Sequence, residues 1–368
     1  MPTTVTAAVV PGTGRPFAVQ QLQLDDPRPD EVRVRLVATG VCHTDANVRD
    51  GLLPTPLPAV LGHEGAGVVE AVGDRITTVA PGDQVVLSAA YCGYCRKCRA
   101  GLVAYCEDLM AQDFGGRRRD GSTSLSSADG PVSSHFFGQS SFATHANVVE
   151  TAVVKVSPDV PLRTLAPLGC GMQTGAGTVL NELRPEAGSS LVVFGVGAVG
   201  GAAIMAARVA GCTTVIGVDL HESRLELAER IGATHTVNPA TTDVVEAIAK
   251  ITHGDGIQYA VDTTAVPAVL RQAAASLAIR GTLALVGAAP AGTDVRFEIG
   301  ESLVKGWTFK TVIQGSAVPQ VFIPRLVELW RQGRFPFDKL VQTYALDDIN
   351  TAFADSASGK VVKPVIVF

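Results

Sequence analysis

Four cysteines lie close together in the run "CGYCRKCRAGLVAYC", at Cys92, Cys95, Cys98 and Cys106. Two short gaps followed by a longer one allow a loop to fold around one ion, and four thiolates in tetrahedral geometry form a closed structural zinc site. The alternatives are a pair of disulfides or four unrelated thiols. Disulfides suit secreted proteins, and the start "MPTTVTAAVVPGTG" has no basic residues followed by an apolar stretch. The spacing therefore favours zinc.

Three further residues of the metal-binding types are spread along the chain. They are Cys42 in "CHTD", His63 in "GHE" and Cys170 in "LGCGM". Two thiolates and one imidazole can hold zinc with the fourth position open for a substrate oxygen, where an alcohol would become more acidic. Taken singly, a cysteine is more often a small buried apolar residue and a histidine a hydrogen-bonded core residue. Beside the four-cysteine loop and the motif described next, a catalytic zinc is favoured.

A glycine-rich turn predicts a dinucleotide site. It satisfies GxGxxG and consists of Gly195, Val196, Gly197, Ala198, Val199 and Gly200. The motif follows the apolar run "SSLVVF" and opens an alanine-rich helix, which is the context that the pattern requires. The three glycines allow a tight turn, a close approach of pyrophosphate and close packing of helix on strand, and the helix N-terminus favours phosphate.

Asp219 ends the next strand, where a carboxylate can accept hydrogen bonds from the adenosine ribose hydroxyls. A 2′-phosphate at this place would meet like charge, and Leu220 rather than an arginine follows. We therefore expect NAD rather than NADP. The alternative is that Asp219 is an ordinary turn residue at the end of a strand.

The pattern of apolar residues predicts two domains. Residues 1–171 contain short alternating strands broken by glycine and proline, which is typical of an all-β fold. Residues 172–313 alternate strands with helices and predict a doubly wound parallel sheet. Residues 314–368 hold one strong helix, "FIPRLVELWRQG", and a final strand, "VVKPVIVF", and we expect them to return to the first domain.

The composition excludes several classes of function. Hydrophobic residues make up 46% of the 368-residue chain and the net charge is −5, which indicates a compact protein without a basic face for nucleic acid. A basic run at residues 115–121, "GGRRRDG", is expected to be a solvated loop. No segment has about 18 consecutive apolar residues, so we expect no membrane span. Seven cysteines in such a chain suit the reducing cytoplasm.

The whole chain resembles the zinc-dependent alcohol dehydrogenases of the medium-chain dehydrogenase/reductase superfamily. The resemblance rests on "GVCHTD", "GHEGAGVVEAVG", the four-cysteine loop, "GVGAVG" with Asp219, and "SGKVVKPVIVF". It implies a mainly β GroES-like catalytic domain joined to a Rossmann domain, two zinc ions per subunit, NAD, and a homodimer or homotetramer joined through the cofactor-domain sheets. The run "WTFKTVIQG" could supply the joining edge strand.

The resemblance also implies roles for individual residues. Cys42, His63 and Cys170 resemble the catalytic zinc ligands, Glu64 the carboxylate near the zinc, and Asp45 the partner of the ligating histidine. Thr44 resembles the acceptor of the alcohol proton, and His43 and Lys363 resemble residues near the pyrophosphate. Further cofactor contacts are implied for Thr174, Arg224, Val286 and Ala288. Asn47 departs from the family, because many members carry histidine there as the outer end of a proton relay.

The resemblance implies that Ser88, Phe136 and Phe137 line the substrate pocket. Two aromatic walls and a small floor suit a flat apolar alcohol, and "FFGQSSFATHANV" resembles the aryl-alcohol (benzyl alcohol) dehydrogenase branch. We therefore expect reversible oxidation of a primary aromatic alcohol to its aldehyde. Alternatively, the two phenylalanines are core residues. The rival functions are a geraniol-like terpenoid alcohol dehydrogenase, an S-(hydroxymethyl)glutathione dehydrogenase, a zinc-bearing binding protein without catalysis, and a nucleic-acid-binding zinc ribbon.

Overall fold

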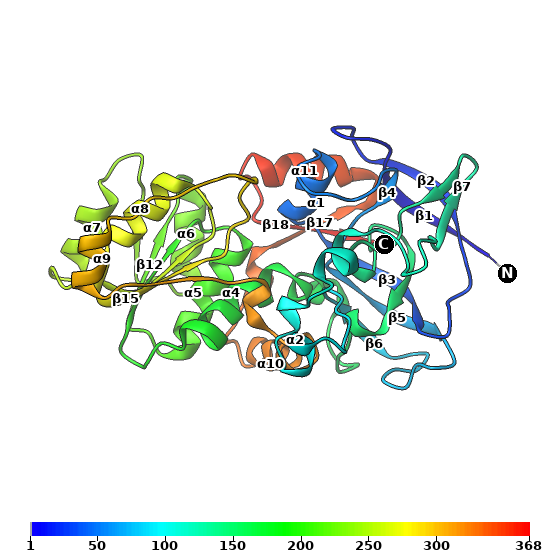
Figure 1. Cartoon of the computed structure of the whole chain (residues 1–368), viewed down its shortest axis with the longest axis horizontal. Coiled ribbons are helices and arrows are strands. Elements are labelled where there is room, and N and C mark those ends of the chain that lie inside the picture. The colour runs from blue at the N-terminus through cyan, green and yellow to red at the C-terminus, as the bar shows by residue number, and fades with distance from the viewer. Residues whose placement is uncertain (1) are drawn as a thin grey trace. The chain divides into compact units, whose positions relative to one another are not determined.

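The computed structural model describes residues 2–368, which form two compact units. The first unit extends to Cys170 and includes Val318–Val327 and Val341–Phe368, and the second comprises Gly171–Ala317 and Glu328–Leu340. Residues 314–317 and 328–340, expected to return to the first domain, group with the second unit instead. Strands dominate the first unit, and strands alternate with helices in the second (Figure 1).

Two largely antiparallel sheets build the first unit. The five-stranded sheet has the order β4-β1-β2-β7-β8, formed by β1 (Thr3–Val10), β2 (Ala18–Leu24), β4 (Ala59–Val60), β7 (Leu125–Ser127) and β8 (Gly130–Val132). The seven-stranded sheet has the order β10-β6-β5-β3-β18-β17, and β9 also pairs with β3. Its strands are β3 (Glu31–Gly40), β5 (Gly65–Val72), β6 (Gln84–Leu87), β9 (His145–Val149), β10 (Val153–Lys155), β17 (Val341–Ala345) and β18 (Lys363–Val367). The expected β-rich first domain is confirmed.

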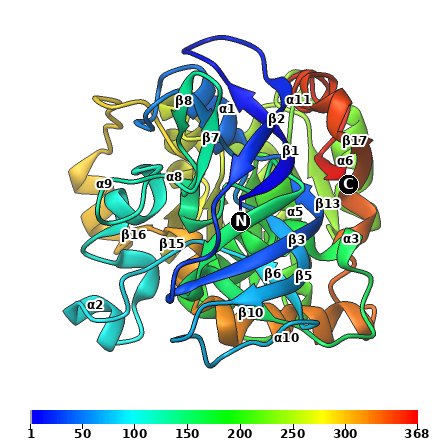
Figure 2. The same cartoon turned by 90° about the vertical axis from the view of Figure 1, so that its right-hand side faces the viewer.

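Strand β3 is the central element of the larger sheet. It pairs in antiparallel fashion with β5, β9 and β18, and Figure 2 shows β3, β5 and β6 side by side. Its valines Val32 and Val34 are fully buried in the core beneath the sheet. The strand ends at Gly40, which pairs with Val365 of β18, and Lys363 at the start of β18 donates to the Val41 carbonyl, so that residues far apart in sequence meet at one end of the sheet.

A six-stranded, entirely parallel sheet builds the second unit, in the order β13-β12-β11-β14-β15-β16. Its strands are β11 (Ser190–Phe194), β12 (Thr214–Val218), β13 (His235–Val237), β14 (Ile257–Asp262), β15 (Leu277–Leu285) and β16 (Thr308–Thr311). Strands β12 and β13 follow β11 on one side of it, and the chain then crosses to the other side of β11, where β14, β15 and β16 follow in order. This reversal is the arrangement of a Rossmann sheet, which places a ligand crevice at the carboxyl ends of β11 and β14. The predicted doubly wound fold is confirmed.

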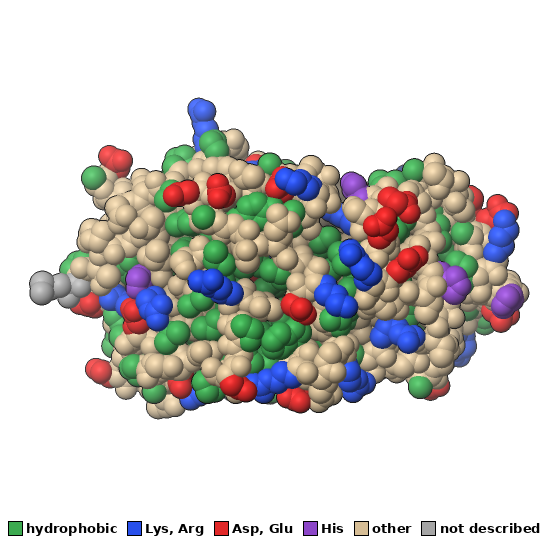
Figure 3. Space-filling view, turned by 180° about the vertical axis from the view of Figure 1, so that it is seen from behind, with side chains coloured by type: hydrophobic (Ala, Val, Ile, Leu, Met, Phe, Trp, Pro, Cys, Tyr) green, Lys and Arg blue, Asp and Glu red, His purple; other side chains and the backbone are tan. Residues whose placement is uncertain are grey.

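Helices connect these strands. In the first unit lie α1 (His43–Arg49), α2 (Arg96–Arg99), α3 (Leu162–Leu165) and α11 (Ile349–Ala357), and α10 (Pro319–Arg331) begins there. The second unit contains α4 (Gly171–Gly177), α5 (Ala198–Ala210), α6 (Glu222–Arg230), α7 (Val244–Ile251), α8 (Pro267–Ala275) and α9 (Ile299–Lys305). Within residues 2–368, no helix has the length and apolar content that crossing a bilayer requires. Basic and acidic side chains are interspersed on the face drawn in Figure 3.

Candidate zinc centres and cofactor site

The four clustered cysteines converge in one lobe of the first unit. Their sulfur atoms all lie within 4.8 Å of one another, and Cys92 Sγ is 3.9 Å from Cys98 Sγ. All seven cysteines are free, so the disulfide alternative is wrong. The N–H groups of Cys95 and Cys98 donate to Cys92 Sγ and Cys95 Sγ at 3.3 and 3.4 Å, and the Cys98 N–H lowers the pKa of the Cys95 thiol to about 6. Four converging sulfurs with backbone donors fit a closed structural zinc site.

A second cluster joins residues from three distant segments of the first unit. Cys42 caps α1, His63 and Glu64 precede β5, and Cys170 follows a short 3-10 helix (Ala166–Gly169). One ligand atom from each of these residues lies within 4.8 Å of the others. The hydrogen bond with Cys170 and the nearby His63 lower the pKa of the Cys42 thiol against the effect of burial. The predicted Cys2His set is therefore brought together, and Glu64 stands beside it.

The two nitrogens of His63 have different surroundings. Nδ1 lies 3.0 Å from Asp45 Oδ1, whereas the buried Nε2 has no hydrogen-bond partner among the described residues. Asp45 also accepts the N–H groups of Cys42 and Gly62, both at 3.0 Å. Burial lowers the pKa of His63, but the charges of Asp45 and Cys42 outweigh burial and raise it. A histidine that donates from Nδ1 and leaves Nε2 without a partner beside two thiols fits a zinc ligand with its orienting carboxylate.

Glu64 forms a fully buried ion pair with Lys363. Lys363 Nζ lies 2.5 Å from Glu64 Oε2 and donates to the Val41 carbonyl at 2.8 Å. Burial raises the pKa of the Glu64 carboxyl to about 7, against the effect of the lysine charge. Gly40 makes room for this pair, because a Cβ there would lie 1.9 Å from Glu64 Oε2. The structure thus places Lys363 beside the second cluster, and its contact with pyrophosphate stays a prediction.

The remaining predicted residues of α1 lie near the cluster at different depths. Thr44 Oγ1 is 3.7 Å from Cys42 Sγ and half-buried, so its hydroxyl is adjacent to the ligands. His43 is exposed, and Asn47 is half-buried one turn further along the helix. The roles of Thr44 and His43 stay predictions.

Aromatic side chains cover the ring of His63. The Phe137 ring stacks on it with centroids 4.4 Å apart and planes 24° apart, and the Phe136 ring meets it edge-on at 5.5 Å. Phe136 is 0% exposed and Phe137 6% exposed, and both belong to the first unit's core. Ser88 is also fully buried, and its Oγ donates to the Gly169 carbonyl at 2.7 Å. All three residues therefore lie next to zinc ligands or their neighbours. The burial of the two phenylalanines agrees with the alternative that they are core residues, and the substrate pocket stays a prediction.

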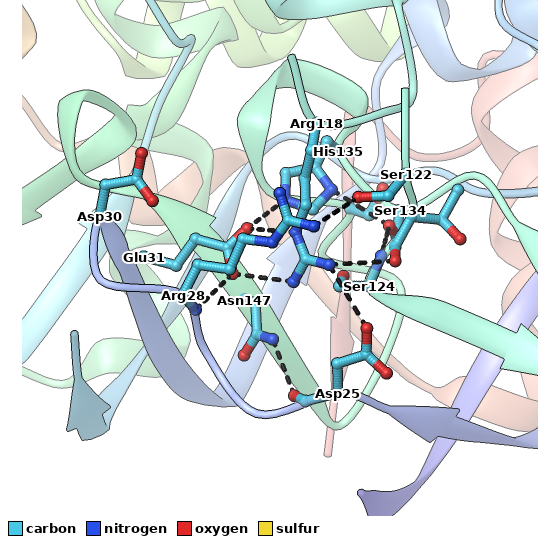
Figure 4. A network of polar contacts seen from close by, with 12 residues as sticks. Asp25, Arg28, Asp30, Glu31, Arg118, Ser122, Ser124, Ser134, His135 and Asn147 are labelled. Atoms are coloured by element: carbon cyan, nitrogen blue, oxygen red, sulfur yellow. Dashed lines mark hydrogen bonds and ion pairs between the residues drawn. The ribbon is translucent and has the colours of Figure 1, made fainter. Parts of the chain in front are cut away.

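A polar network that the sequence did not reveal anchors the segment leading to Phe136 (Figure 4). Arg118 Nε and Nη2 donate to the two carboxylate oxygens of Glu31 at 2.7 and 2.9 Å, and His135 Nε2 lies 3.0 Å from Glu31 Oε1. Burial raises the pKa of Glu31, but hydrogen bonds from His135 and Arg118 outweigh it and lower the pKa to about 2. The expectation of a solvated basic loop is wrong for Arg118, whose side chain is 7% exposed.

The glycine-rich turn has the geometry expected of a cofactor loop. Gly195 has φ +86°, and a Cβ on Gly200 would lie 1.9 Å from the Gly195 carbonyl, so both positions require glycine. A Cβ on Gly197, the N-cap of α5, would meet nothing within 4 Å, so the second glycine faces open space. Thr263, which the sequence analysis missed, donates to the carbonyls of Phe194 and Gly195 at 3.0 and 2.9 Å. No sequence motif marks this threonine.

Asp219 lies directly beneath this turn. Its Oδ2 accepts the Val196 N–H at 2.8 Å, and its Oδ1 accepts the His221 N–H at 2.9 Å. Arg224 Nη1 lies 3.5 Å from Asp219 Oδ2. Burial raises the pKa of Asp219, but the donors from His221 and Val196 outweigh burial and lower it. Asp219 therefore holds the turn in place as a carboxylate, and Arg224 lies beside it. The contacts of both residues with the adenosine ribose stay predictions.

The other predicted cofactor contacts are dispersed within the second unit. Thr174 lies in α4 and is 9% exposed. Val286 and Ala288 follow β15, where the Val286 N–H donates to the Asp262 carbonyl at 2.9 Å and Ala288 is exposed. Their contacts with the nicotinamide end of the cofactor stay predictions.

Comparison with known proteins identifies the family. Residues 28–158 match the alcohol dehydrogenase GroES-like domain, and residues 198–330 match the zinc-binding dehydrogenase domain. The geraniol dehydrogenase of Castellaniella defragrans is 44% identical over 364 residues, which cover 98% of this chain and 97% of that protein. An alcohol dehydrogenase zinc-binding domain protein from Burkholderia ambifaria has a TM-score of 0.98 and 52% identity over the full length of both chains. The benzyl alcohol dehydrogenase of Acinetobacter calcoaceticus has a TM-score of 0.96 and 48% identity, covering 100% of this chain and 99% of that one. With its two zinc-binding clusters and its nicotinamide-dinucleotide fold, the chain belongs to the zinc-binding alcohol dehydrogenases of the medium-chain dehydrogenase/reductase superfamily.

Proposed function

We propose that this alcohol dehydrogenase oxidises primary aromatic alcohols of the benzyl type to their aldehydes. The observation that carries the proposal is the stack of Phe137 on His63, with Phe136 and Phe114 packed edge-on around it. Aromatic rings beside a zinc ligand favour a flat apolar substrate over a polar or flexible one. The 48% identity to a benzyl alcohol dehydrogenase supports the same substrate class.

The residues of the second cluster would each contribute to the reaction. Cys42, His63 and Cys170 would hold the zinc, which supplies Lewis-acid polarisation of a substrate oxygen. Asp45 keeps His63 Nδ1 protonated, so that Nε2 is left for the metal. The Thr44 hydroxyl would accept the alcohol proton and pass its own proton on to solvent, and a bound nicotinamide dinucleotide would supply the hydride acceptor. The alcohol thus loses two electrons, the dinucleotide gains them, and one proton is released.

The experiment is a side-by-side measurement of kcat/KM for benzyl alcohol, geraniol and S-(hydroxymethyl)glutathione with NAD. We expect benzyl alcohol to exceed geraniol, and the glutathione adduct to be the poorest substrate. A higher kcat/KM for geraniol would replace the aromatic assignment with a terpenoid one, which the 44% identity to a geraniol dehydrogenase favours. If the zinc-loaded protein forms no NADH with any alcohol, the proposal is wrong and a binding protein without catalysis is favoured instead.

We also propose that NAD is preferred to NADP, because the buried carboxylate of Asp219 lies beneath the turn where a 2′-phosphate would meet like charge. Asp219→Asn is the sharpest test, since an asparagine keeps one acceptor for the Val196 N–H while it removes the charge and the acceptor for the His221 N–H. The ratio of kcat/KM for NAD to that for NADP should fall by about tenfold, a change of roughly 1.4 kcal/mol. An unchanged ratio would contradict the assignment.

We further propose that the chain forms a homodimer or homotetramer through β16. This strand is the edge of the parallel sheet, and α9, which precedes it, exposes Ile299, Leu303 and Val304 at 81%, 79% and 84%. A second copy could add its own edge strand and cover these side chains. Light scattering should show at least a dimer, and Leu303→Glu should lower the measured mass. Val321→Glu, at a 71% exposed valine in α10, is the matched control and should leave the mass unchanged.

A further inference from the structure

The turn at residues 137–140 has an unusual backbone. Phe137, Gly138 and Ser140 have φ values of +52°, +67° and +53°, in the left-handed region that side-chain-bearing residues rarely adopt. Such conformations persist only where the surrounding structure holds them, and they are frequent at functional sites. The contacts of this turn therefore indicate what the strained backbone positions.

Gln139, in the middle of the turn, is fully buried and uses both ends of its amide. Its Nε2 donates to the carbonyls of His63 and Ser88 at 3.0 and 2.8 Å. Its Oε1 accepts the Gly65 N–H at 3.1 Å. One side chain therefore spans His63 and Gly65 and ties this segment to the end of β6, where Ser88 follows Leu87. Gly65 fits this arrangement, because a Cβ there would lie 3.2 Å from Gln139 Oε1 and 2.8 Å from Leu87 Cδ1.

Ser88 extends this connection to another ligand. Its Oγ donates to the carbonyl of Gly169, the residue before Cys170. Gly169 packs against the same strand, since a Cβ there would lie 2.0 Å from the Leu87 carbonyl. The backbone beside His63 and the backbone beside Cys170 are thus linked through Gln139 and Ser88, without either side chain being a ligand.

The turn also contacts the imidazole itself. Phe137, the residue two before Gln139, stacks on the His63 ring at 4.4 Å, while Asp45 holds the Nδ1 edge of the same ring. Three different groups therefore hold His63: Phe137 covers the face of its ring, Asp45 binds its Nδ1, and Gln139 binds its backbone carbonyl. Two of these come from the turn at residues 137–140.

We propose that Gln139 is a positioning residue of the metal centre, which sets the spacing between His63 and Cys170 and so slows loss of the zinc. The proposal rests on the zinc assignment and not on the choice of alcohol. Neither the GxGxxG motif nor the cysteine pattern identifies this glutamine, and no chemistry of its own is needed. Its effect is transmitted through three hydrogen bonds to the backbone.

The test is the rate of zinc release from the loaded enzyme to excess chelator at pH 7. Gln139→Met keeps the length of the side chain and removes all three hydrogen bonds. One of the two zinc ions per subunit should leave at least about tenfold faster than in the unmodified enzyme, while the zinc of the four-cysteine lobe is retained. In the cobalt-substituted enzyme the visible absorption bands should shift, because these bands report the ligand geometry.

Ser141→Ala is the matched control. It removes a buried hydroxyl at the residue directly after the turn, bonded to Thr39 Oγ1 at 2.8 Å, with no side-chain bond to a ligand segment. Its zinc release should stay within twofold of the unmodified enzyme. If Gln139→Met and Ser141→Ala release zinc at equal rates, the positioning role is refuted.

Ser88→Ala provides a second route should Gln139→Met fail to fold. It removes the hydroxyl that donates to the Gly169 carbonyl, and a faster loss of the same zinc ion is expected. If Gln139→Met does not fold and Ser88→Ala releases zinc at the unmodified rate, Gln139 supports the fold rather than the metal centre, and the proposal is refuted. These outcomes concern zinc release alone, so they do not depend on whether benzyl alcohol or geraniol is the better substrate.

Discussion

Asp45 Oδ1 and His63 Nδ1 lie 3.0 Å apart, and both side chains are completely buried. The pair determines which histidine nitrogen is available for a metal, because the carboxylate accepts a hydrogen bond from Nδ1–H and so keeps the proton on that nitrogen. The two residues come from α1 and from the segment before β5, so the pairing depends on how these elements pack.

Asp45→Asn should therefore weaken zinc binding at the second cluster by about 10–100-fold. An asparagine can still accept the Gly62 N–H but lacks the charge that stabilises the oriented imidazole. Chelator competition measures the affinity. Asp50→Asn, at the exposed end of the same helix, is the control and should have no effect. Equal affinities for the two variants would contradict the role of Asp45.

Cys98→Ser should abolish only the zinc of the four-cysteine lobe. Cys98 is buried and its sulfur lies 3.9 Å from that of Cys92, so one missing thiolate opens a closed tetrahedral site. Metal analysis should fall from two zinc ions to one per subunit, and the free energy of unfolding should fall by roughly 3 kcal/mol. Complete loss of both ions would show that the two centres are not independent.

Glu31→Gln should destabilise the protein by about 3 kcal/mol at pH 7, because it removes the buried carboxylate that binds Arg118 at 2.7 Å and leaves only the more exposed Asp25 at 3.3 Å. The folded pKa of Glu31 is lowered from 4.5 to about 2, so its contribution is complete above pH 4.5 and is lost as the pH falls toward 2. The difference from the unmodified protein in urea unfolding should be constant between pH 7 and pH 5 and shrink at lower pH. Glu70→Gln, at a more exposed ion pair, should show a much smaller difference.

Asp113→Asn should stabilise the protein with the opposite dependence on pH. Asp113 is 1% exposed, and burial raises its pKa from 3.8 to about 8, so the folded state retains a proton that the unfolded chain releases. Stability therefore falls as the pH rises from about 4 to 8, by up to about 1.4 kcal/mol per pH unit, and asparagine removes this loss. The melting temperature of Asp113→Asn should exceed that of the unmodified protein by more at pH 8 than at pH 5. Asparagine can still accept the Ala90 N–H that Asp113 accepts at 3.1 Å.

Asn47→His should change the pH profile of the reaction. Asparagine does not titrate, so the unmodified enzyme should show little dependence of kcat on a group with a pKa near 7. A histidine in this position of α1 should add an ionisation near its ordinary pKa of about 6.5. An identical pH profile for both proteins would count against a proton path through this position.

The sequence by itself determined the features that depend on short spacing. The four-cysteine loop, the GxGxxG turn and Asp219 at the end of the next strand lie within single structural units, so residue type and local pattern were sufficient. The all-β and α/β character of the two domains followed from the periodicity of apolar residues for the same reason.

Only the tertiary structure decided which distant side chains meet. The pairing of Lys363 with Glu64, the burial of Arg118 on Glu31, and the amide of Gln139 between His63 and Ser88 all join segments far apart in the chain. A polar residue in a loop looks the same in sequence whether it is solvated or buried against a partner. Its role is settled by long-range packing, because a buried charge or amide persists only where the fold supplies the groups that satisfy it.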